Sequence, residues 1–291
     1  MLSYRHAFHA GNHADVLKHF VLVQLLRYLN QKDKPWWFID THAGAGAYKL
    51  DSEYAKKNAE FEGGISRLWR RPGGSPLGGH GDDAPLPAPL ADYVAQVQAL
   101  NPGGRLRHYP GSPLIALNLA RHDDHLRLFE LHSTDVQLLD QNFRDAARRV
   151  AIRQADGFAE LKSVLPPQPR RGLTLIDPSY EDKQDYVRVI GALKEGIGRF
   201  ATGMFMVWYP LIQLGTARQM PEKLKKLADK WLDVSLTVHA PAADGFGMHG
   251  SGLFIVNPPY TLTATLRETM PVLVDLLGQD AAATHILTTS G

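Results

Sequence analysis

The stretch WWFIDTHAGAGAYK at residues 36–49 decides the fold class of this chain. Its apolar half, which ends in Asp40, is typical of a buried strand, and its glycine-rich half is typical of a turn that brings backbone close to a ligand. Further strand-like runs follow, mostly with helical stretches between them. Because strands that alternate with helices form a parallel sheet with both faces covered, the sequence predicts a doubly wound, Rossmann-like α/β fold.

Seven strands are expected in this sheet. They are residues 36–40, 126–130, 150–154, 173–177, 203–209, 232–239 and 252–257. The last two are joined by a tight segment rather than a helix, so we expect an antiparallel last strand at one edge of a mostly parallel sheet. Before the first strand, residues 13–30 repeat apolar side chains at helical spacing, with Asn12 as the expected cap.

A helical insertion is expected after the first strand. Residues 51–104 contain two helical stretches, near 53–70 and 88–100, which flank a segment rich in Gly and Pro. We predict that residues 51–104 form an inserted helical subdomain. The Rossmann-like domain is then built from residues 1–50 and 105–291.

Composition narrows the possible classes of protein. The chain has 291 residues, 32 Lys+Arg against 30 Asp+Glu, and no Cys. This excludes disulfides, a thiolate nucleophile, iron–sulfur clusters and Cys-type zinc sites. The longest apolar run is far shorter than the ~20 residues of a membrane span, and the amino terminus lacks the apolar segment of a signal peptide. We therefore expect a cytoplasmic protein, and a monomer because no exposed apolar stripe is evident.

Ligands of a doubly wound sheet bind at the carboxyl ends of its strands. Gly44 and Gly46 allow close approach of the backbone, but a dinucleotide fingerprint needs a third glycine where this chain has Lys49, which disfavours a dehydrogenase. A nucleoside that carries an amino acid, such as S-adenosylmethionine, fits better. Glu130 and Asp156, beyond the next two strands, are predicted to accept hydrogen bonds from its ribose and its adenine amine. Alternatively, Glu130 only ends a surface strand and Asp156 begins a simple turn.

The motif Asp177-Pro178-Ser179-Tyr180 follows the fourth strand and indicates methylation of an exocyclic amine. The lone pair of such a nitrogen is delocalised into its ring. A carboxylate and a neighbouring carbonyl that both accept its hydrogens would aim the lone pair at a methyl donor. Asp177 and the Pro178 carbonyl supply these two acceptors, and Tyr180 can stack on the base.

A second motif of this kind is Asn257-Pro258-Pro259-Tyr260. It matches the usual amine-methylating pattern better than the motif at 177–180 does. However, it ends the antiparallel last strand, whose carboxyl end should point away from the cofactor, whereas the fourth strand should lie beside the first. We therefore expect Asp177 to be the acceptor.

Five segments together resemble the RlmJ family. They are YRHAFHAGNHADVLKH (4–19), THAGAGAY (41–48), YPGSP (109–113), FELH (129–132) and the motif at 177–180. The resemblance implies a class I methyltransferase that uses S-adenosylmethionine to methylate N6 of one adenine in bacterial 23S ribosomal RNA. It also implies cofactor contacts and an RNA contact. The cofactor contacts are His19, His42, Ser112, Glu130, Asp156 and Gly157, and the RNA contact is Tyr4. This sequence departs from the family pattern at Ser179, where the family usually has a second Pro. The loop at 177–180 is therefore expected to be less rigid.

Histidines near the amino terminus raise the question of a metal site. His9 and His13 are four residues apart, but the carboxylate of an HExxH motif is missing and Gly11 lies between them, so we expect no metal. Lys18 and His19 are predicted to lie where the first helix approaches the carboxylate of the cofactor, and Lys18 is also a candidate substrate contact, although it could equally be a solvated helix charge. Tyr4 could belong to a frayed terminus.

RNA contacts are expected from basic and aromatic side chains. The candidate arginines lie at positions 67, 70, 71, 105, 107, 144, 148, 149, 153, 170 and 171. If several share the face that holds Asp177, affinity should fall steeply with salt. After the fifth strand, Trp208 is expected to fill the core, and Tyr209 could fill the core or stack on a nucleotide.

Two alternatives differ from RNA methylation. A DNA adenine methyltransferase would use the insertion to bind the duplex, but residues 51–104 lack an evident recognition helix rich in Arg, Asn and Gln. A non-catalytic RNA-binding module would keep only the cofactor fold. Labelled methyl transfer to RNA, to DNA and to no acceptor separates these functions.

Overall fold

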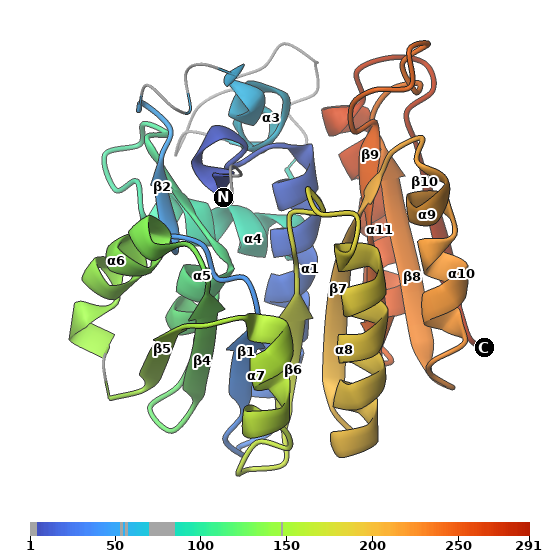
Figure 1. Cartoon of the computed structure of the whole chain (residues 1–291). Helices are drawn as coiled ribbons and strands as arrows, with labels where there is room; N and C mark the ends of the chain where they lie inside the picture. Colours follow the sequence, from blue (N-terminus) through green and yellow to red (C-terminus); the bar gives the residue numbers. More distant parts are fainter. Residues whose placement is uncertain (1–4, 53–54, 56–57, 70–84, 147) are drawn as a thin grey trace.

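The computed structural model contains an eight-stranded sheet in the order β10-β8-β9-β7-β6-β1-β4-β5 (Figure 1). It describes the chain except for residues 1–4, 53–54, 56–57, 70–84 and 147. The strands are β1 (Trp37–Asp40), β4 (His125–Glu130), β5 (Val150–Gln154), β6 (Gly172–Ile176), β7 (Met204–Leu211), β8 (Trp231–Thr237), β9 (Gly250–Val256) and β10 (Thr284–Thr289).

All seven predicted strands are present, and five neighbours, β5-β4-β1-β6-β7, are parallel. The predicted pairing of β8 with β9 is confirmed as antiparallel. Its predicted place at the edge is wrong, because β9 lies between β7 and β8, and β10 pairs with β8 outside them. The prediction of seven strands therefore missed β10, whose half-exposed, threonine-rich sequence gives little apolar signal.

Helices cover both faces of the sheet. On one face α7 (Gly157–Val164), α8 (Asp185–Arg199), α9 (Gly215–Arg218) and α10 (Met220–Lys225) enclose one core. On the other, α1 (His13–Asn30), α4 (Ala88–Ala99), α5 (Ser112–Leu119) and α11 (Leu262–Leu277) enclose a second. Figure 1 shows α7 and α8 in front of the sheet and α1 behind it. The remaining helical elements are η1 (His6–Phe8), η2 (Glu60–Gly63), α3 (Ile65–Leu68), α6 (Ser133–Asn142) and η3 (Arg144–Ala146).

Helix α1 begins where the sequence predicted. The side chain of Asn12 accepts a hydrogen bond from the Asp15 N–H at 3.0 Å, which satisfies one of the free donors of the first turn. Most of its side chains are buried, because α1 lies between the sheet and the helices α4, α5 and α11. Polar side chains on its first turns, including Asp15 and Lys18, are therefore held inside the protein at the end of the sheet.

Part of the predicted insertion packs on α1. Helix α4 buries Leu90, Tyr93, Val94 and Val97 in the same core as α1 and the sheet. Strands β2 (Ala47–Lys49) and β3 (His108–Pro110) pair antiparallel, and β3 contacts α4. Most of the predicted helical stretch near 53–70 is described, and from residue 60 on it forms only the short elements η2 and α3, with a left-handed Ala59 (φ +50°) just before η2. Residues 70–84, which include most of the Gly/Pro-rich segment, lie outside the described residues. The boundaries 51–104 remain a prediction.

The order of the parallel strands places three acidic groups together. β6 pairs with β1, as expected for the fourth and first strands, and β4 pairs with β1 on its other side. Asp40 ends β1, Glu130 ends β4 and Asp177 follows β6. Because the carboxyl ends of parallel strands meet at one edge, these carboxylates lie around one position.

Candidate active site

A cavity of about 330 Å³ opens at the carboxyl ends of β1, β4 and β6, beside the first turns of α1. Most of the predicted site residues line it. These are His19, His42, Gly44, Ser112, Glu130, Lys18, Asp177, Pro178 and Tyr180. Side chains from α1 and from the strand ends therefore surround a single cavity.

The glycine loop after β1 forms one wall of this cavity. Gly44 has φ +59°, a backbone conformation that favours glycine, and a Cβ there would lie 2.3 Å from the Tyr48 hydroxyl oxygen. Its N–H donates to Glu130 Oε2 at 2.8 Å. The loop is thus fixed against the end of β4, and the Tyr48 hydroxyl packs against it where a Gly44 side chain would otherwise lie.

Glu130 holds two turns together. Its Oε1 accepts a hydrogen bond from the His132 N–H at 2.7 Å, while Oε2 accepts from Gly44. The alternative that Glu130 only ends a surface strand does not describe this position, since β4 lies between β1 and β5 and Glu130 lines the cavity. Burial raises the pKa of its carboxyl group. Each carboxylate oxygen has a second lone pair, so both can still accept from a vicinal diol.

Asp40 is a site residue that sequence reasoning did not assign. It is fully buried, and its Oδ2 accepts a hydrogen bond from the Ser112 hydroxyl at 2.7 Å. Its Oδ1 accepts from the His42 N–H at 3.1 Å. Burial raises the pKa of Asp40 to about 7. The sequence contains the signal that would have identified Asp40, because this residue ends the first strand, directly before the glycine loop.

His42 and His19 are neutral side chains of the cavity wall. Burial lowers the pKa of His42 to about 4 and that of His19 to about 3. His19 Nδ1 lies 2.8 Å from the Tyr109 hydroxyl, which lies 2.9 Å from the Tyr93 hydroxyl of α4. A buried chain of hydrogen bonds therefore joins the predicted insertion to the cavity wall.

Asp177 is held by Lys18. Lys18 Nζ donates to Asp177 Oδ2 at 2.6 Å and lies 2.9 Å from Asp15 Oδ1. Asp15 Oδ2 in turn lies 2.9 Å from His6 Nε2. The Lys18 side chain is 6% exposed, so the alternative of a solvated helix charge is wrong.

The electrostatics of this pair are set by burial and by the short contact. Burial raises the pKa of Asp177, and the Lys18 ammonium partly offsets that rise. Burial alone would lower the pKa of Lys18, but Asp15 and Asp177 raise it above its usual range. Lys18 therefore stays charged beside a carboxylate whose affinity for a proton is increased.

Tyr180 lies against the aromatic wall of the cavity. Its backbone has φ +57°, its hydroxyl donates to the Trp208 carbonyl at 2.7 Å, and its ring centroid lies 4.7 Å from that of Tyr186. Trp208 also lines the cavity, so its predicted place in the core is only partly correct. Tyr209 is 2% exposed and belongs to the core.

Two predicted site residues, Asp156 and Gly157, are not among the described residues that line the cavity. The side chain of Asp156 caps α7 by accepting a hydrogen bond from the Phe158 N–H at 2.9 Å. The Phe158 ring in turn packs against the His42 ring. A Cβ at Gly157 would lie 2.0 Å from the Thr41 carbonyl oxygen, so the absence of a side chain allows α7 to approach the glycine loop. Tyr4 lies outside the described residues.

Some candidate arginines for RNA lie at the opposite end of the sheet. The guanidinium of Arg171 donates to the carbonyls of Leu29 and Lys34, which precede β1. Arg149 donates to the carbonyls of Ala120 and Arg121, which precede β4. These two arginines therefore do not share the face that holds Asp177, while Arg70 and Arg71 lie outside the described residues.

The motif at 257–260 also lies away from the cavity. The side-chain amide of Asn257 donates to the carbonyls of Ala201 and Gly203, both at 2.8 Å, just before β7 begins. Tyr260 is 82% exposed. As expected from the direction of β9, Asn257 is at the amino end of the parallel strands, whereas Asp177 is at their carboxyl end.

No group of three or more His, Asp or Glu side chains among the described residues is placed to hold a metal ion; His9, for example, pairs with Glu60 at 2.8 Å. No described helix is both long and apolar enough to cross a membrane.

Comparison with known proteins gives the family. The family described as "RsmJ: Ribosomal RNA large subunit methyltransferase D, RlmJ" matches residues 33–287. Ribosomal RNA large subunit methyltransferase J of Escherichia coli is 46% identical over 274 residues, which cover 94% of this chain and 93% of the relative. Its namesake from Haemophilus influenzae is 44% identical over 283 residues, with coverages of 95% and 94%.

A solved structure agrees with this assignment. A Legionella pneumophila protein, known from its crystal structure, superposes with a TM-score of 0.86 at 33% identity and covers 97% of this chain and 98% of its own. The match extends over the parallel sheet and the strands around the cavity. This chain therefore belongs to the RlmJ family of ribosomal RNA large subunit methyltransferases.

Proposed function

We propose that this chain transfers a methyl group from S-adenosylmethionine to N6 of an adenine in 23S ribosomal RNA. The observation that carries the proposal is the largely buried Asp177 carboxylate, fixed by Lys18 at 2.6 Å in the cavity that the glycine loop also lines. The names of the two curated relatives, both large-subunit ribosomal RNA methyltransferases, support the substrate class.

The cavity wall fits this cofactor. Gly44 lines the cavity with a left-handed backbone that favours glycine, and Glu130 offers carboxylate lone pairs to a ribose diol. Ser112, His19 and His42 face the same space. Asp156 and Gly157 lie next to it, at the start of α7, where the Asp156 carboxylate would accept from an adenine amine. Bound there, S-adenosylmethionine would supply an electrophilic methyl group on its sulfonium.

Asp177 and Pro178 would hold the amine that is methylated. Among the described residues, hydrogen bonds reach only Oδ2 of Asp177, so Oδ1 can accept one amine hydrogen and the Pro178 carbonyl the other. These two hydrogen bonds would direct the nitrogen lone pair toward the methyl donor, and Tyr180 would supply an aromatic surface for the base. We propose Lys18 and Tyr4 as further RNA contacts of this site.

The proton leaves the nitrogen only after positive charge has developed there. A carboxylate cannot remove it from the neutral amine, because the amine is far too weak an acid. The raised pKa of Asp177 increases its affinity for that proton, while the Lys18 charge keeps the group ionised before reaction. Asp177 therefore acts as hydrogen-bond acceptor first and as proton acceptor afterwards.

Labelled methyl transfer tests the proposal. The protein is incubated with radiolabelled S-adenosylmethionine and unmodified 23S ribosomal RNA, DNA, or no acceptor, and the modified nucleotide is mapped. We expect N6-methyladenine at one position of the RNA. Modification of DNA alone would support a DNA methyltransferase, and no incorporation into any acceptor would support a non-catalytic binding module.

We also propose that the enzyme acts as a monomer in the cytoplasm. The basis for the monomer is that the sequence shows no exposed apolar stripe. Ribosomal RNA is made in the bacterial cytoplasm, which places the reaction there. Light scattering of the protein at assay concentration tests whether it is a monomer, with a mass near 32.3 kDa as the expected result.

A further inference from the structure

The loop between β8 and β9 carries an exposed aromatic side chain at the edge of the active-site cavity. Its base is fixed by two backbone hydrogen bonds, from the Val238 N–H to the His249 carbonyl at 2.9 Å and from the His249 N–H to the Leu211 carbonyl at 3.0 Å. Gln213 adds a bond to the Ala242 carbonyl at 2.9 Å. The sheet thus holds both ends of the loop in place.

The tip of this loop is Gly245-Phe246-Gly247. Both glycines have left-handed backbones, with φ +78° and +87°. A Cβ at Gly247 would meet nothing within 4 Å, so crowding does not explain the glycines and the backbone conformation does. Among the described residues, the N–H groups of Gly245 and Phe246 bond only within the loop, to Ala242 and Asp244. The backbone can therefore turn on either side of Phe246.

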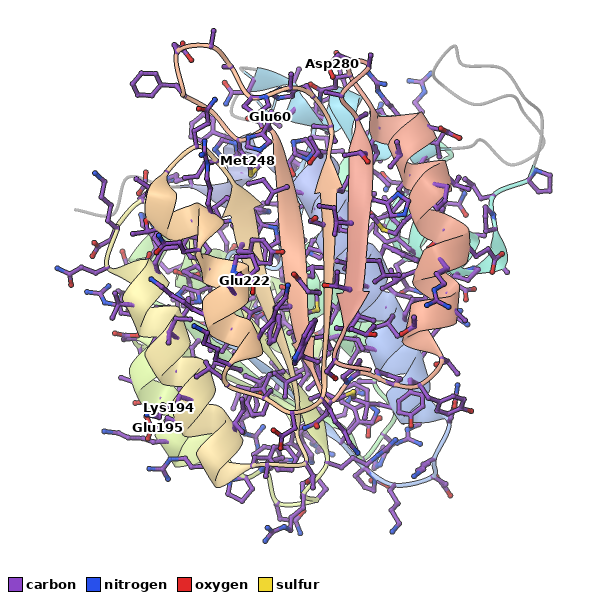
Figure 2. The ribbon with its side chains drawn as sticks, turned by 90° about the vertical axis from the view of Figure 1, so that its right-hand side faces the viewer. Glu60, Lys194, Glu195, Glu222, Met248 and Asp280 are labelled. Atoms are coloured by element: carbon purple, nitrogen blue, oxygen red, sulfur yellow. The ribbon has the colours of Figure 1, made fainter. Side chains whose placement is uncertain are left out.

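Phe246 is exposed although it is close to the cavity. Its side chain is 79% exposed, and the loop gives it no core to pack into. Met248, two residues further along, lines the cavity with Asp177 and Trp208. Two residues span at most about 7 Å, so the Phe246 ring can reach the cavity rim. Figure 2 shows Met248 at the same end of the molecule as Asp280 and Glu60, and Lys194 and Glu195 at the other end.

The reaction itself creates a need for such a side chain. An adenine that reaches a buried carboxylate must leave its stack in the RNA, which costs a few kcal/mol. An apolar side chain that inserts between neighbouring bases lowers this cost, because it replaces the lost stacking surface. An exposed phenylalanine beside the cavity has the right chemistry and the right position for this step.

We propose that Phe246 is a wedge that stacks on the nucleotides next to the target adenine while that adenine occupies the cavity. This inference rests on the proposed function and deepens it, since it assigns a substrate contact that acts only on stacked RNA. Phe246 does not touch the reacting atoms, so it is a positioning residue.

Two RNAs of the same target sequence separate this role from a structural one. In the first, the adenine is stacked within a folded fragment, and in the second it lies in a short unstructured strand. We compare kcat/KM for the wild type, Phe246→Ala, Phe246→Trp and Tyr260→Ala. Tyr260 is a matched control, because it is an aromatic residue that is 82% exposed but lies away from the cavity.

We expect Phe246→Ala to lower kcat/KM on the folded RNA by about tenfold or more and to change it less than about twofold on the unstructured strand. Phe246→Trp should keep most of the activity, and Tyr260→Ala should keep all of it. A 2-aminopurine at the target position gives a second readout. Its fluorescence should rise when the wild type binds the folded RNA and should rise less with Phe246→Ala.

Each other outcome is decisive. If the wild type modifies neither RNA, the proposed function fails. If the wild type is active and Phe246→Ala equals it on folded RNA by both readouts, the wedge is wrong. Equal losses of kcat/KM on both RNAs in Phe246→Ala would also overturn the inference. So would a variant that modifies RNA normally but no longer binds a partner protein. Cofactor affinity and melting temperature, measured for each variant, establish that the fold is retained.

Discussion

Lys18 of α1 and Asp177 at the end of β6 form a largely buried ion pair, with Nζ and Oδ2 2.6 Å apart. The two residues are 159 positions apart in sequence, so the pair joins the first helix to the fourth parallel strand. The same lysine contacts Asp15 one turn earlier on α1. The carboxylate that is proposed to accept the substrate amine is therefore positioned and kept charged by a helix that lies outside the regular β-α alternation.

Replacing Lys18 should change the pH dependence of methyl transfer. Burial raises the pKa of Asp177 and Lys18 offsets this, so Lys18→Met should raise that pKa further. Since the ionised carboxylate is the active form, the rate falls as pH decreases through the pKa. The acidic limb of the pH–rate profile should therefore move to higher pH, with about a tenfold loss at neutral pH. Lys194→Met, at the other end of the molecule, should leave the profile unchanged.

Asn257→Ala should affect stability and leave catalysis intact. The variant loses hydrogen bonds to the Ala201 and Gly203 carbonyls and places alanine at φ +53°. We expect a loss of roughly 1–2 kcal/mol in the free energy of unfolding, measured in urea. The yield of methylated RNA should equal that of the wild type. A folded variant without transfer would mean that the motif at 257–260, and not Asp177, is the acceptor.

Tyr93→Phe tests the link between α4 and the cofactor site. The change removes the hydroxyl that lies 2.9 Å from the Tyr109 hydroxyl, which in turn positions His19. We expect stability to fall by about 1 kcal/mol and cofactor affinity, measured by calorimetry, to fall a few-fold. Tyr186→Phe is the control, because the buried Tyr186 hydroxyl has no partner among the described residues. Equal cofactor affinities for the two variants would show that the hydrogen bonds from Tyr93 through Tyr109 to His19 do not support the cofactor site.

Acid sensitivity should decrease when His13 is replaced by leucine. Burial lowers the pKa of His13 to about 4 in the folded state, against 6.5 for the ordinary side chain, and Nδ1 has no partner among the described residues. The unfolded chain therefore takes up a proton first, and stability falls as pH drops from 6.5 to 4. This residue accounts for up to roughly 3 kcal/mol of that loss.

The measurement is the free energy of unfolding at pH 7.5 and pH 5 for the wild type, His13→Leu and His122→Leu. The His122 side chain is 97% exposed, so this variant should follow the wild type. A pH-dependent loss in His13→Leu as large as that of the wild type would contradict the expected role of His13. His19 and His42, whose pKa values are also lowered by burial, should account for the acid sensitivity that remains.

Much of the fold followed from local patterns. Each buried parallel strand is a short apolar run between helices, so its existence and the class I methyltransferase fold were predictable. The position of β9 was not, because pairing partners of antiparallel strands depend on contacts distant in sequence. β10 was missed, since an edge strand that is half exposed needs no apolar alternation.

The site was predictable where position in the sheet determines it. Glu130 and Asp177 stand at strand ends, and strand order alone brings them together. The roles of Lys18 and Tyr93 could not be obtained in this way, because their partners lie on elements far away in sequence. Asp156 and Gly157 were assigned to the cofactor, yet both have clear structural contacts in capping α7 and packing it on Thr41.

The central claim is that the Asp177 carboxylate accepts the amine that is methylated. The most direct test is the single-turnover rate of methyl transfer to 23S ribosomal RNA by Asp177→Asn, with cofactor affinity and melting temperature measured on the same preparation. The account predicts that the cofactor still binds and that the rate falls by at least about 100-fold. Transfer at the wild-type rate by the folded variant would contradict it.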